Sequence, residues 1–172
     1  LEFRRVLFRS AIGQIDSSKN GAALIATVEP TNDYGIVFNK DAKPQIDIWE
    51  DFQCPFCNLF EKTMTTYIED VIRNKEAKVI FHMASFIGPD SVRAANAANC
   101  AVAEGRFIEF HRALYQIQGA ENTGVFANAN LVEVGKRLGI TNPEFTKCVN
   151  DGKYSGVVNN VASSMAKNNV NG

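Results

Sequence analysis

Several features that would assign a protein to a class are missing from this sequence. No apolar run approaches the roughly 20 residues that a membrane-spanning helix needs, so we expect no part of the chain shown to cross a membrane. Basic and acidic residues nearly balance, at 18 and 19, and lysine and arginine form no block. Binding through phosphate contacts is therefore not expected, and nucleic acid is excluded as a partner.

What the chain does contain is the composition of an ordinary globular protein. Its 172 residues are 45% hydrophobic and 22% charged, with a formal net charge of −1. This length is enough for one domain with a hydrophobic core and is short for two. The four cysteines are an even number, which suits two disulfides in an oxidising compartment, although many cytosolic enzymes also carry four.

The two ends of the chain differ from its middle. Residues 1–10, LEFRRVLFRS, resemble the translation of a short sequencing adapter and are set aside as an artefact, so the native beginning is expected to lie upstream. Residues 11–34 are rich in serine, asparagine, glycine and aspartate and predict a linker or arm, in which only ALIATV has any strand character. The last residues, KNNVNG, contain neither a helix stop signal nor a closing strand.

The middle of the chain alternates between strand and helix patterns. Short β-branched or aromatic runs at 35–38 and 45–52 predict two strands, and a third follows at 78–87. Between the last two, apolar residues recur every three or four positions from Pro55 to about Asn74, which predicts a helix with one buried stripe. This β–α–β order favours a parallel pair of strands joined by a right-handed crossover.

After this unit the chain is predicted to be helical almost throughout. An alanine-rich segment, an amphipathic segment at 106–118 and a segment at 131–140 precede a last helix that runs from Pro143 to about Lys167. The fold class that these patterns indicate is α/β with a large helical block.

One motif carries chemistry: Cys54 and Cys57 in the run DFQCPFCNLF, residues 51–60. Pro55 suits the first position of a helix, where its missing N–H is not needed. Cys54 then lies at the N-cap and Cys57 one turn further, about 5–6 Å away, within reach of a disulfide. The free N–H groups and the positive end of the helix dipole stabilise a thiolate at Cys54, and a stabilised reduced form makes the disulfide more oxidising.

Two plainer interpretations of the CxxC pair compete with redox chemistry. A structural zinc site needs a second pair of ligands, and no other CxxC, CxxH or HxxxH motif occurs in the sequence. A structural disulfide across one helical turn closes a very small loop and adds little stability. A thiol pair that exchanges electrons with other proteins is therefore the interpretation that the residues favour.

The segment EDFQCPFCNLFE resembles the active-site segment of the DsbA-like thiol–disulfide oxidoreductases. The resemblance covers residues 35–172 and implies a thioredoxin fold with an inserted helical subdomain at about 90–165. The implied reaction is the transfer of a disulfide to reduced, unfolded secreted proteins outside the cytoplasm, in the periplasm or at the cell surface. By the same resemblance, a membrane quinone-linked thiol oxidase recharges the site, and a signal peptide or membrane anchor precedes the chain shown.

The resemblance also implies a role for each residue of the motif. Cys54 is the nucleophile that forms a mixed disulfide with the substrate, and Cys57 is the more buried thiol that resolves it. Pro55 and Phe56, which lie between them, set the redox poise. Neither a cofactor nor a metal is implied. Phe56 and the nearby Phe60 either pack in the core or form an exposed apolar rim that grips unfolded chains.

Two other functions stay open. A thioredoxin-like binding module with purely structural cysteines is redox-inactive and holds a partner or nascent chain without exchanging disulfides. A reductant or isomerase runs the same exchange in the other direction, because the poise depends on the partner that recharges the site. The position of the motif at a helix start favours an oxidising enzyme over the binding module.

The chain departs from the family pattern in two places. Many relatives carry a buried, proton-relaying acid on the strand six residues before the first cysteine, but here that position is Ile48, and Glu50 and Asp51 lie closer to the motif. Relatives also have a cis proline followed by the strands that complete the sheet, whereas this chain stops at Gly172, just before that point. We therefore expect the C-terminal strands to be missing and one edge of the sheet to be unpaired.

The remaining candidate residues have structural explanations. Cys100 and Cys148 lie in two predicted helices of the insertion, and the resemblance implies a structural disulfide between them; two free buried thiols are the alternative. His82 and His111 lie among apolar residues without a nucleophile at a motif spacing. They are interpreted as packed or hydrogen-bonded histidines without a catalytic role.

Overall fold

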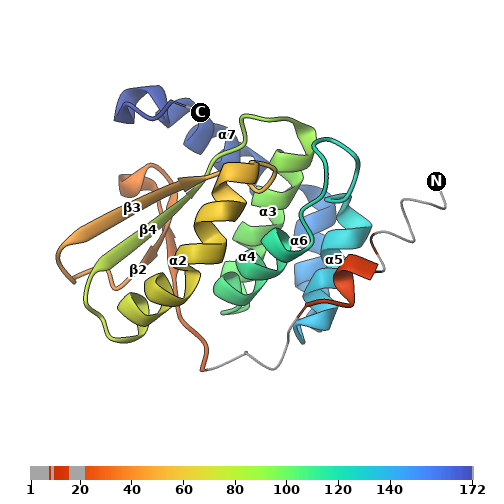
Figure 1. Cartoon of the computed structure of the whole chain (residues 1–172), viewed down its shortest axis with the longest axis horizontal. Helices are drawn as coiled ribbons and strands as arrows, with labels where there is room; N and C mark the ends of the chain where they lie inside the picture. The colour runs from red at the N-terminus through yellow and green to blue at the C-terminus, as the bar shows by residue number, and fades with distance from the viewer. Residues whose placement is uncertain (1–7, 9, 16–21, 172) are drawn as a thin grey trace.

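The computed structural model describes residues 8, 10–15 and 22–171 of the chain (Figure 1). Its elements are, in order, β1 (Thr27–Glu29), the 3₁₀ turn η2 (Pro30–Asn32), β2 (Gly35–Phe38), β3 (Gln45–Glu50), α2 (Pro55–Arg73), β4 (Lys78–Met83), α3 (Pro89–Ala103), α4 (Phe107–Gln116), α5 (Asn128–Arg137), α6 (Pro143–Asp151), α7 (Ser155–Ser164) and η3 (Ala166–Asn168). The strands therefore precede the helical block, and α2 is the one long helix among them.

A four-stranded sheet in the order β1-β2-β4-β3 forms one side of the molecule. β1–β2 and β2–β4 are antiparallel, whereas β3 and β4 are parallel, with Ile48 opposite Phe81 and Glu50 opposite Met83. α2 connects the two parallel strands, because such a pair needs a crossover. The predicted α/β class and its β–α–β unit are thus confirmed, although β3 and β4 end a few residues earlier than predicted.

The helical block packs around α3. In Figure 1 the sheet lies to the left, α3 to α6 to the right, and α2 between them. α3 contacts α4, α5, α6 and α7, and its buried alanines are small enough to let these helices approach closely. None of the helices in the described part of the chain is both long and apolar enough to span a membrane.

The segment predicted as a linker or arm contributes to the fold. Strand β1 pairs with β2 along its whole length. Ile12 is only 2% exposed and lies in the hydrophobic core. Phe8, from the segment set aside as an artefact, packs against the same core. The structure differs from the prediction here because single apolar residues in a polar segment give no periodic signal. Most of residues 1–10 lies outside the described part of the chain.

Helix α2 buries only part of its apolar stripe. Its buried side chains include Ile68, Val71 and Ile72 in the second half of the helix. Four large apolar side chains are exposed instead: Phe56, Leu59, Phe60 and Tyr67. The prediction of one buried stripe is therefore wrong for the first half, because an apolar period does not say how much of its width a neighbouring element will cover.

The last predicted helix is two helices. α6 ends at Asp151 and is followed by Gly152, whose φ of 62° is left-handed, and α7 starts at Ser155. Glycine adopts this conformation without the steric cost that a side chain adds. The predicted start is confirmed, since Asn142 caps α6 by accepting a hydrogen bond from the Glu144 N–H at 3.1 Å.

Strand β3 lies at one edge of the sheet. In the described part of the chain it pairs only with β4, so its other side offers free backbone N–H and C=O groups. An unpaired edge was predicted for the strands of the β–α–β unit, and of these two β3 is the edge strand. The CxxC motif begins four residues after β3 ends and therefore lies beside this edge.

Candidate active site

The CxxC motif lies at the junction of β3 and α2. Cys54 is the N-cap of α2, with extended backbone angles (φ −71°, ψ 119°), and Pro55 is the first helical residue. The Cys54 N–H donates to the Asp51 carbonyl at 2.9 Å, and the Asn58 N–H donates to the Cys54 carbonyl at 3.1 Å. These bonds place Cys57 one turn into the helix, which is the local geometry that the sequence predicts.

Both cysteines of the motif are free thiols and half-buried. Burial raises the pKa of the Cys57 thiol to about 12, opposed by a hydrogen bond from the Asp51 backbone and assisted by Cys54 and Glu50. Cys57 is therefore a protonated thiol at neutral pH. Cys54 lies at the N-cap, before the first-turn N–H groups that have no partner within the helix, and its side chain makes no capping hydrogen bond.

An exposed apolar rim borders the motif. It consists of Phe56, Leu59 and Phe60, which are 79%, 63% and 38% exposed. The sequence left open whether Phe56 and Phe60 pack in the core or are exposed, and in the structure both are exposed. Large apolar side chains grouped on a surface are typical of a site that contacts another molecule.

A glutamine at the end of α4 holds the loop that carries the motif. Gln118 Nε2 donates to the carbonyl oxygens of Phe52 and Cys54 at 2.7 and 3.1 Å. Its Oε1 accepts from Asn58 Nδ2 at 2.7 Å, and Asn58 also donates to the Tyr115 carbonyl. These bonds couple the helical insertion to Cys54, and sequence reasoning missed them because Gln118 is 64 residues away in the chain.

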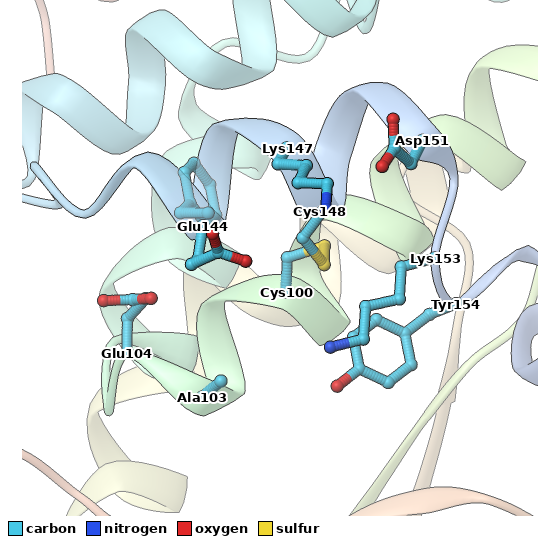
Figure 2. A pocket seen from close by; sticks show the side chains of 10 residues that line it. Cys100, Ala103, Glu104, Glu144, Lys147, Cys148, Asp151, Lys153 and Tyr154 are labelled. Atoms are coloured by element: carbon cyan, nitrogen blue, oxygen red, sulfur yellow. A yellow bond between two sulfur atoms is a disulfide. The ribbon is translucent and has the colours of Figure 1, made fainter.

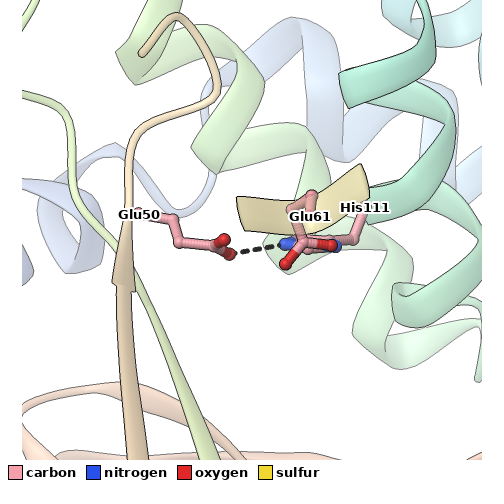
Figure 3. A group of neighbouring side chains, drawn as sticks. All are labelled: Glu50, Glu61 and His111. Carbon is pink, nitrogen blue, oxygen red and sulfur yellow. Dashed lines mark hydrogen bonds and ion pairs between the residues drawn. The ribbon is translucent and has the colours of Figure 1, made fainter. Parts of the chain in front are cut away.

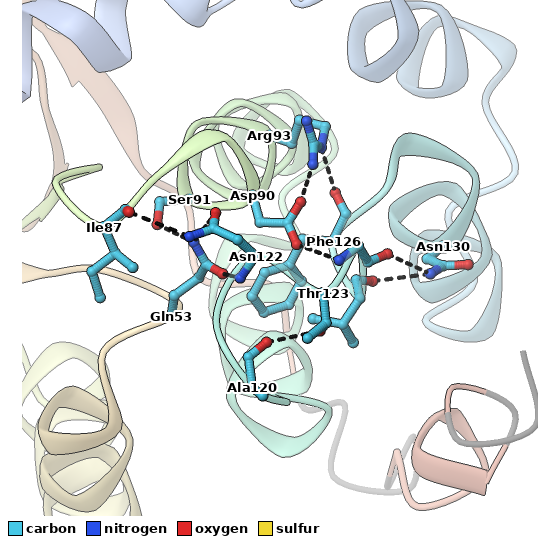
Figure 4. Close-up of polar contacts among 12 residues, drawn as sticks. Gln53, Ile87, Asp90, Ser91, Arg93, Ala120, Asn122, Thr123, Phe126 and Asn130 are labelled. Carbon is cyan, nitrogen blue, oxygen red and sulfur yellow. Dashed lines mark hydrogen bonds and ion pairs between the residues drawn. The ribbon is translucent and has the colours of Figure 1, made fainter. Parts of the chain in front are cut away.

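The buried Asp51 anchors the residues before the motif. Its Oδ1 accepts from the Gln53 N–H at 2.8 Å and from Ser91 Oγ at 2.6 Å, and its Oδ2 accepts from the Ile87 N–H at 3.1 Å. Gln53 in turn accepts from the Asn122 N–H at 2.6 Å (Figure 4). The network ties the motif to the start of α3 and to the loop after α4, so the sulfur positions depend on both.

Three buried side chains, one each from β3, α2 and α4, lie close together (Figure 3). His111 Nε2 is 2.8 Å from Glu50 Oε2, and its Nδ1 is 3.6 Å from Glu61 Oε2. Burial raises the pKa of Glu50 to about 7, and the pKa of His111 is also raised, since the two carboxylates outweigh the opposing effect of burial. His111 is hydrogen-bonded, as interpreted from the sequence, but its acidic partners could not be seen there.

The second histidine lies on the other face of the sheet. His82 Nε2 is 3.0 Å from Asp47 Oδ1, and its ring stacks on Trp49 at 3.9 Å between centroids. Burial lowers the pKa of His82, although Asp47 acts in the opposite direction. These contacts fit the interpretation of His82 as a packed, hydrogen-bonded residue.

The other two cysteines form a disulfide inside the helical block. Cys100 in α3 and Cys148 in α6 are bonded across a sequence separation of 48, with their Cα atoms 6.0 Å apart. The bridge lines a surface pocket whose side chains include Glu104, Glu144 and Lys147 (Figure 2). Nothing in this pocket resembles a catalytic constellation, and the bridge joins two helices that are not neighbours in sequence.

A sheet with a parallel β–α–β unit, a CxxC pair at the start of its helix and a helical block inserted afterwards define a class: thioredoxin-fold proteins with an inserted helical subdomain. The chain belongs to the thioredoxin family, since the family model described as Thioredoxin matches residues 31–172. No curated protein matches the chain in sequence.

Solved structures identify the branch of this family. DsbA from Mycobacterium tuberculosis in its oxidised form is 26% identical, with a TM-score of 0.68 over 80% of this chain and 79% of that one. In its reduced form it is 28% identical, with a TM-score of 0.65 over 76% and 73%. The resemblance to the DsbA-like proteins is thereby confirmed.

Two more distant structures support the fold alone. MdbA from Corynebacterium matruchotii, a thiol-disulfide oxidoreductase, has a TM-score of 0.72 at 20% identity, over 97% of this chain and 83% of that one. BdbD from Bacillus subtilis has a TM-score of 0.70 at 21% identity, over 87% and 83%. The helical block is therefore part of a shared architecture.

Proposed function

We propose that this protein donates a Cys54–Cys57 disulfide to reduced, unfolded secreted proteins outside the cytoplasm. The coarser assignment, a thiol–disulfide oxidoreductase of the DsbA type, rests on the family match and on the M. tuberculosis DsbA structures. One observation carries the finer proposal: Cys54 caps α2 while Cys57 lies one turn inside with its pKa raised to about 12. Two adjacent thiols in such different surroundings are suited to different steps of an exchange.

The proposed reaction proceeds through one mixed disulfide. A substrate thiolate attacks Cys54 Sγ of the oxidised enzyme, the Cys54–Cys57 bond breaks, and Cys57 leaves as a thiolate that takes up a proton. A second thiolate of the substrate then attacks the substrate sulfur of the mixed disulfide, and Cys54 leaves as a thiolate. The substrate loses two electrons and gains a disulfide, and the enzyme is left as a dithiol.

The neighbours of the two cysteines have proposed roles as well. Pro55 opens the helix and so fixes the angle at which both sulfurs leave the backbone. Phe56 sits between the cysteines with 79% of its surface exposed, where it can contact a bound substrate and influence the poise of the pair. Together with Leu59 and Phe60 it offers apolar surface to unfolded chains, which expose apolar side chains of their own.

A membrane quinone-linked thiol oxidase is the proposed recharging partner. After each turnover the dithiol must return two electrons to an acceptor, and a second dithiol–disulfide protein does so by the same exchange chemistry. The Cys100–Cys148 disulfide supports a location outside the cytoplasm, because such bonds persist in oxidising compartments and are rare in the cytosol.

A redox titration tests the proposal. The protein is equilibrated in glutathione buffers of graded potential, and the free thiols of Cys54 and Cys57 are counted by alkylation and mass spectrometry. A disulfide donor is expected to have a potential of about −120 to −200 mV, whereas a structural disulfide lies below about −300 mV. The oxidised protein is then mixed with a reduced, unfolded protein that has several cysteines. If this substrate gains no disulfides and the potential is that of a structural bond, the chain is a redox-inactive binding module.

A further inference from the structure

The second cysteine pair borders a surface pocket that the proposed reaction does not use. The pocket lies between the end of α3 and α6, and both Cys100 and Cys148 line it. Its free volume is about 280 Å³, close to the lower end of the range for small-molecule sites, about 300–1,000 Å³. Figure 2 shows the bond between the two sulfur atoms in the middle of the side chains that line the pocket. A small molecule that enters the pocket therefore meets this bond.

The two sulfur atoms of the bridge have different surroundings. Cys100 is only 2% exposed and lies in α3 among fully buried alanines such as Ala97 and Ala101. Cys148, in α6, is partly exposed and packs against the core from its edge. Thiol–disulfide exchange depends on which sulfur an attacking thiolate can reach. An incoming thiolate is therefore expected to attack Cys148 and to leave Cys100 untouched.

The pocket is lined by charges of both signs that are free to bind a ligand. Lys147 and Lys153 supply ammonium groups, and Glu144 and Asp151 supply carboxylates. Across the described residues, none of these four side chains takes part in an ion pair. A third carboxylate, Glu104, already accepts a hydrogen bond at 3.0 Å from the asparagine that caps α6. A ligand that carries both an ammonium group and a carboxylate can pair with both kinds of side chain.

The class of ligand follows from the combination of these charges with a reactive bond. Charged side chains are common on protein surfaces, and alone they mark no site. Here they surround a disulfide, which reacts with thiolates. A low-molecular-weight thiol built on an amino acid, such as cysteine or glutathione, carries a thiol, an ammonium group and a carboxylate in one small molecule. Such a thiol matches both the charges and the bond.

We propose that Cys148 is a thiolation site, at which a small thiol with an ammonium group and a carboxylate opens the Cys100–Cys148 bond. The thiolate attacks Cys148 Sγ and forms a new disulfide with it, and Cys100 leaves as a thiolate that takes up a proton. The small thiol is oxidised to a disulfide and Cys100 is reduced to a thiol, so no further oxidant or reductant is needed. The reverse attack by Cys100 on Cys148 Sγ restores the bridge and releases the small thiol.

Burial of the leaving sulfur makes this exchange slow. Cys100 leaves into an apolar contact between helices, where a thiolate is poorly stabilised, and a poorer leaving group departs more slowly. Because the small thiol is a reactant, the modified fraction rises with its concentration. The site is separate from the CxxC motif, so the inference does not rest on the proposed function.

The test is peptide mass spectrometry of the whole folded protein after incubation with reduced glutathione. Exchange is stopped with acid, free thiols are alkylated, and trypsin then separates the cysteines, because Cys100 lies in residues 94–106, Cys148 in 148–153 and the CxxC motif in 41–62. We expect glutathione on 148–153 and an alkylated thiol on 94–106. Glutathione on 94–106 overturns the proposal, and so does a bridge that opens only at urea concentrations that unfold the protein.

A matched pair of lysine variants tests whether the pocket recognises the thiol. Lys147→Gln removes one ammonium group and should slow opening by glutathione about threefold, the effect of one exposed ion pair. Opening by 2-mercaptoethanol, which carries no charge besides its thiolate, should change less at the same thiolate concentration. Lys136→Gln, at an exposed position of α5 outside the pocket, changes the net charge equally and should leave both rates unchanged. Equal rates with glutathione in the two variants overturn the recognition by the pocket.

The two proposals are decided by different peptides of the same digest. A protein that donates its Cys54–Cys57 disulfide but never carries glutathione at Cys148 refutes the thiolation site and supports the proposed function. A protein that carries glutathione at Cys148 but transfers no disulfide to a reduced protein does the reverse.

Discussion

The two cysteine pairs of this molecule differ in their spacing, their bonding and their surroundings. Cys54 and Cys57 are one helical turn apart, half-buried and unbonded, and buried titratable groups lie beside them. Cys100 and Cys148 are separated by 48 residues and bonded, and they join two helices of an alanine-rich block. A short separation leaves the bond free to open because little of the fold depends on it, whereas a long separation makes the bond part of the fold.

The surroundings of the pairs differ as much as their spacing. The first pair is approached by Glu50 at the end of β3, by Asp51 in the loop that follows and by Gln118 in the loop after α4, so its chemistry depends on three separate segments. The second pair shares its surface pocket with charged side chains such as Glu104, Glu144 and Lys147, but as a disulfide it does not titrate. A reactive cysteine pair therefore differs from a structural one mainly in the charged and polar groups that act on its thiols.

Single substitutions in the first pair should have the largest effect on exchange. Cys54→Ser is expected to lower disulfide transfer by at least about 100-fold, because no thiol remains to form the mixed disulfide. Cys57→Ser should instead accumulate mixed disulfides when it is mixed with a protein that carries a disulfide, because the Cys54 thiolate attacks that disulfide and the neighbouring thiol that would release the mixed disulfide is gone. A transfer assay with a reduced protein measures the first effect, and non-reducing mass spectrometry after mixing with the disulfide-bearing protein measures the second. Equal trapping by the two variants would contradict the assigned division of labour.

Removing the Cys100–Cys148 pair should lower the stability of the protein and leave disulfide transfer nearly unchanged. The double variant Cys100→Ala with Cys148→Ala is expected to lose about 4 kcal/mol of unfolding free energy, because the open chain regains the entropy of a long loop. Its rate of disulfide transfer should stay within about twofold of wild type at a temperature where both are folded. Urea unfolding and a transfer assay measure the two quantities. A large loss of transfer without a loss of stability would show that this pair takes part in the reaction.

A smaller effect is expected from removing the hydrogen bonds that Gln118 makes to the loop carrying the CxxC motif. Gln118→Ala removes two hydrogen bonds to the carbonyls before and at Cys54 and one from Asn58, and should cost about 1–3 kcal/mol of unfolding free energy. We expect transfer to slow several-fold, because the sulfur of Cys54 is held less firmly. Gln116→Ala, at the exposed last residue of α4, two positions before Gln118, is the control. Identical transfer rates in the two variants would mean that the hydrogen bonds of Gln118 do not affect the rate of disulfide transfer.

Local signals in the sequence were enough to place the motif. Pro55 after a β-branched strand predicts where α2 begins, and this alone sets Cys54 at the N-cap and Cys57 one turn later. The β–α–β order likewise predicts the parallel pair of β3 and β4. Such features depend on neighbours within a few residues, and these are visible in a single chain.

The features that the sequence did not reveal depend on distant contacts. His111 meets Glu50 across 61 residues, and no spacing rule links an acid on a strand to a histidine on a later helix. The exposure of Phe56 was left undecided because a helix with apolar residues on a wide arc does not say which part is covered. The short strand β1 was mostly missed, since its stability comes from pairing with β2 rather than from its own composition.

The Cys100–Cys148 bridge also sets how far the protein can be stretched. A chain pulled from its two ends extends by about 3.3–3.6 Å for each residue that is free to straighten. While the bridge is closed, the 48-residue separation contributes only the 6.0 Å between the two Cα atoms. Roughly 160 Å of contour is thus withheld from the applied force until the bond is reduced. Helices α4 and α5 lie entirely inside this loop. In a pulling experiment, reduction of the bond would therefore appear as a stepwise increase in the extension of the chain.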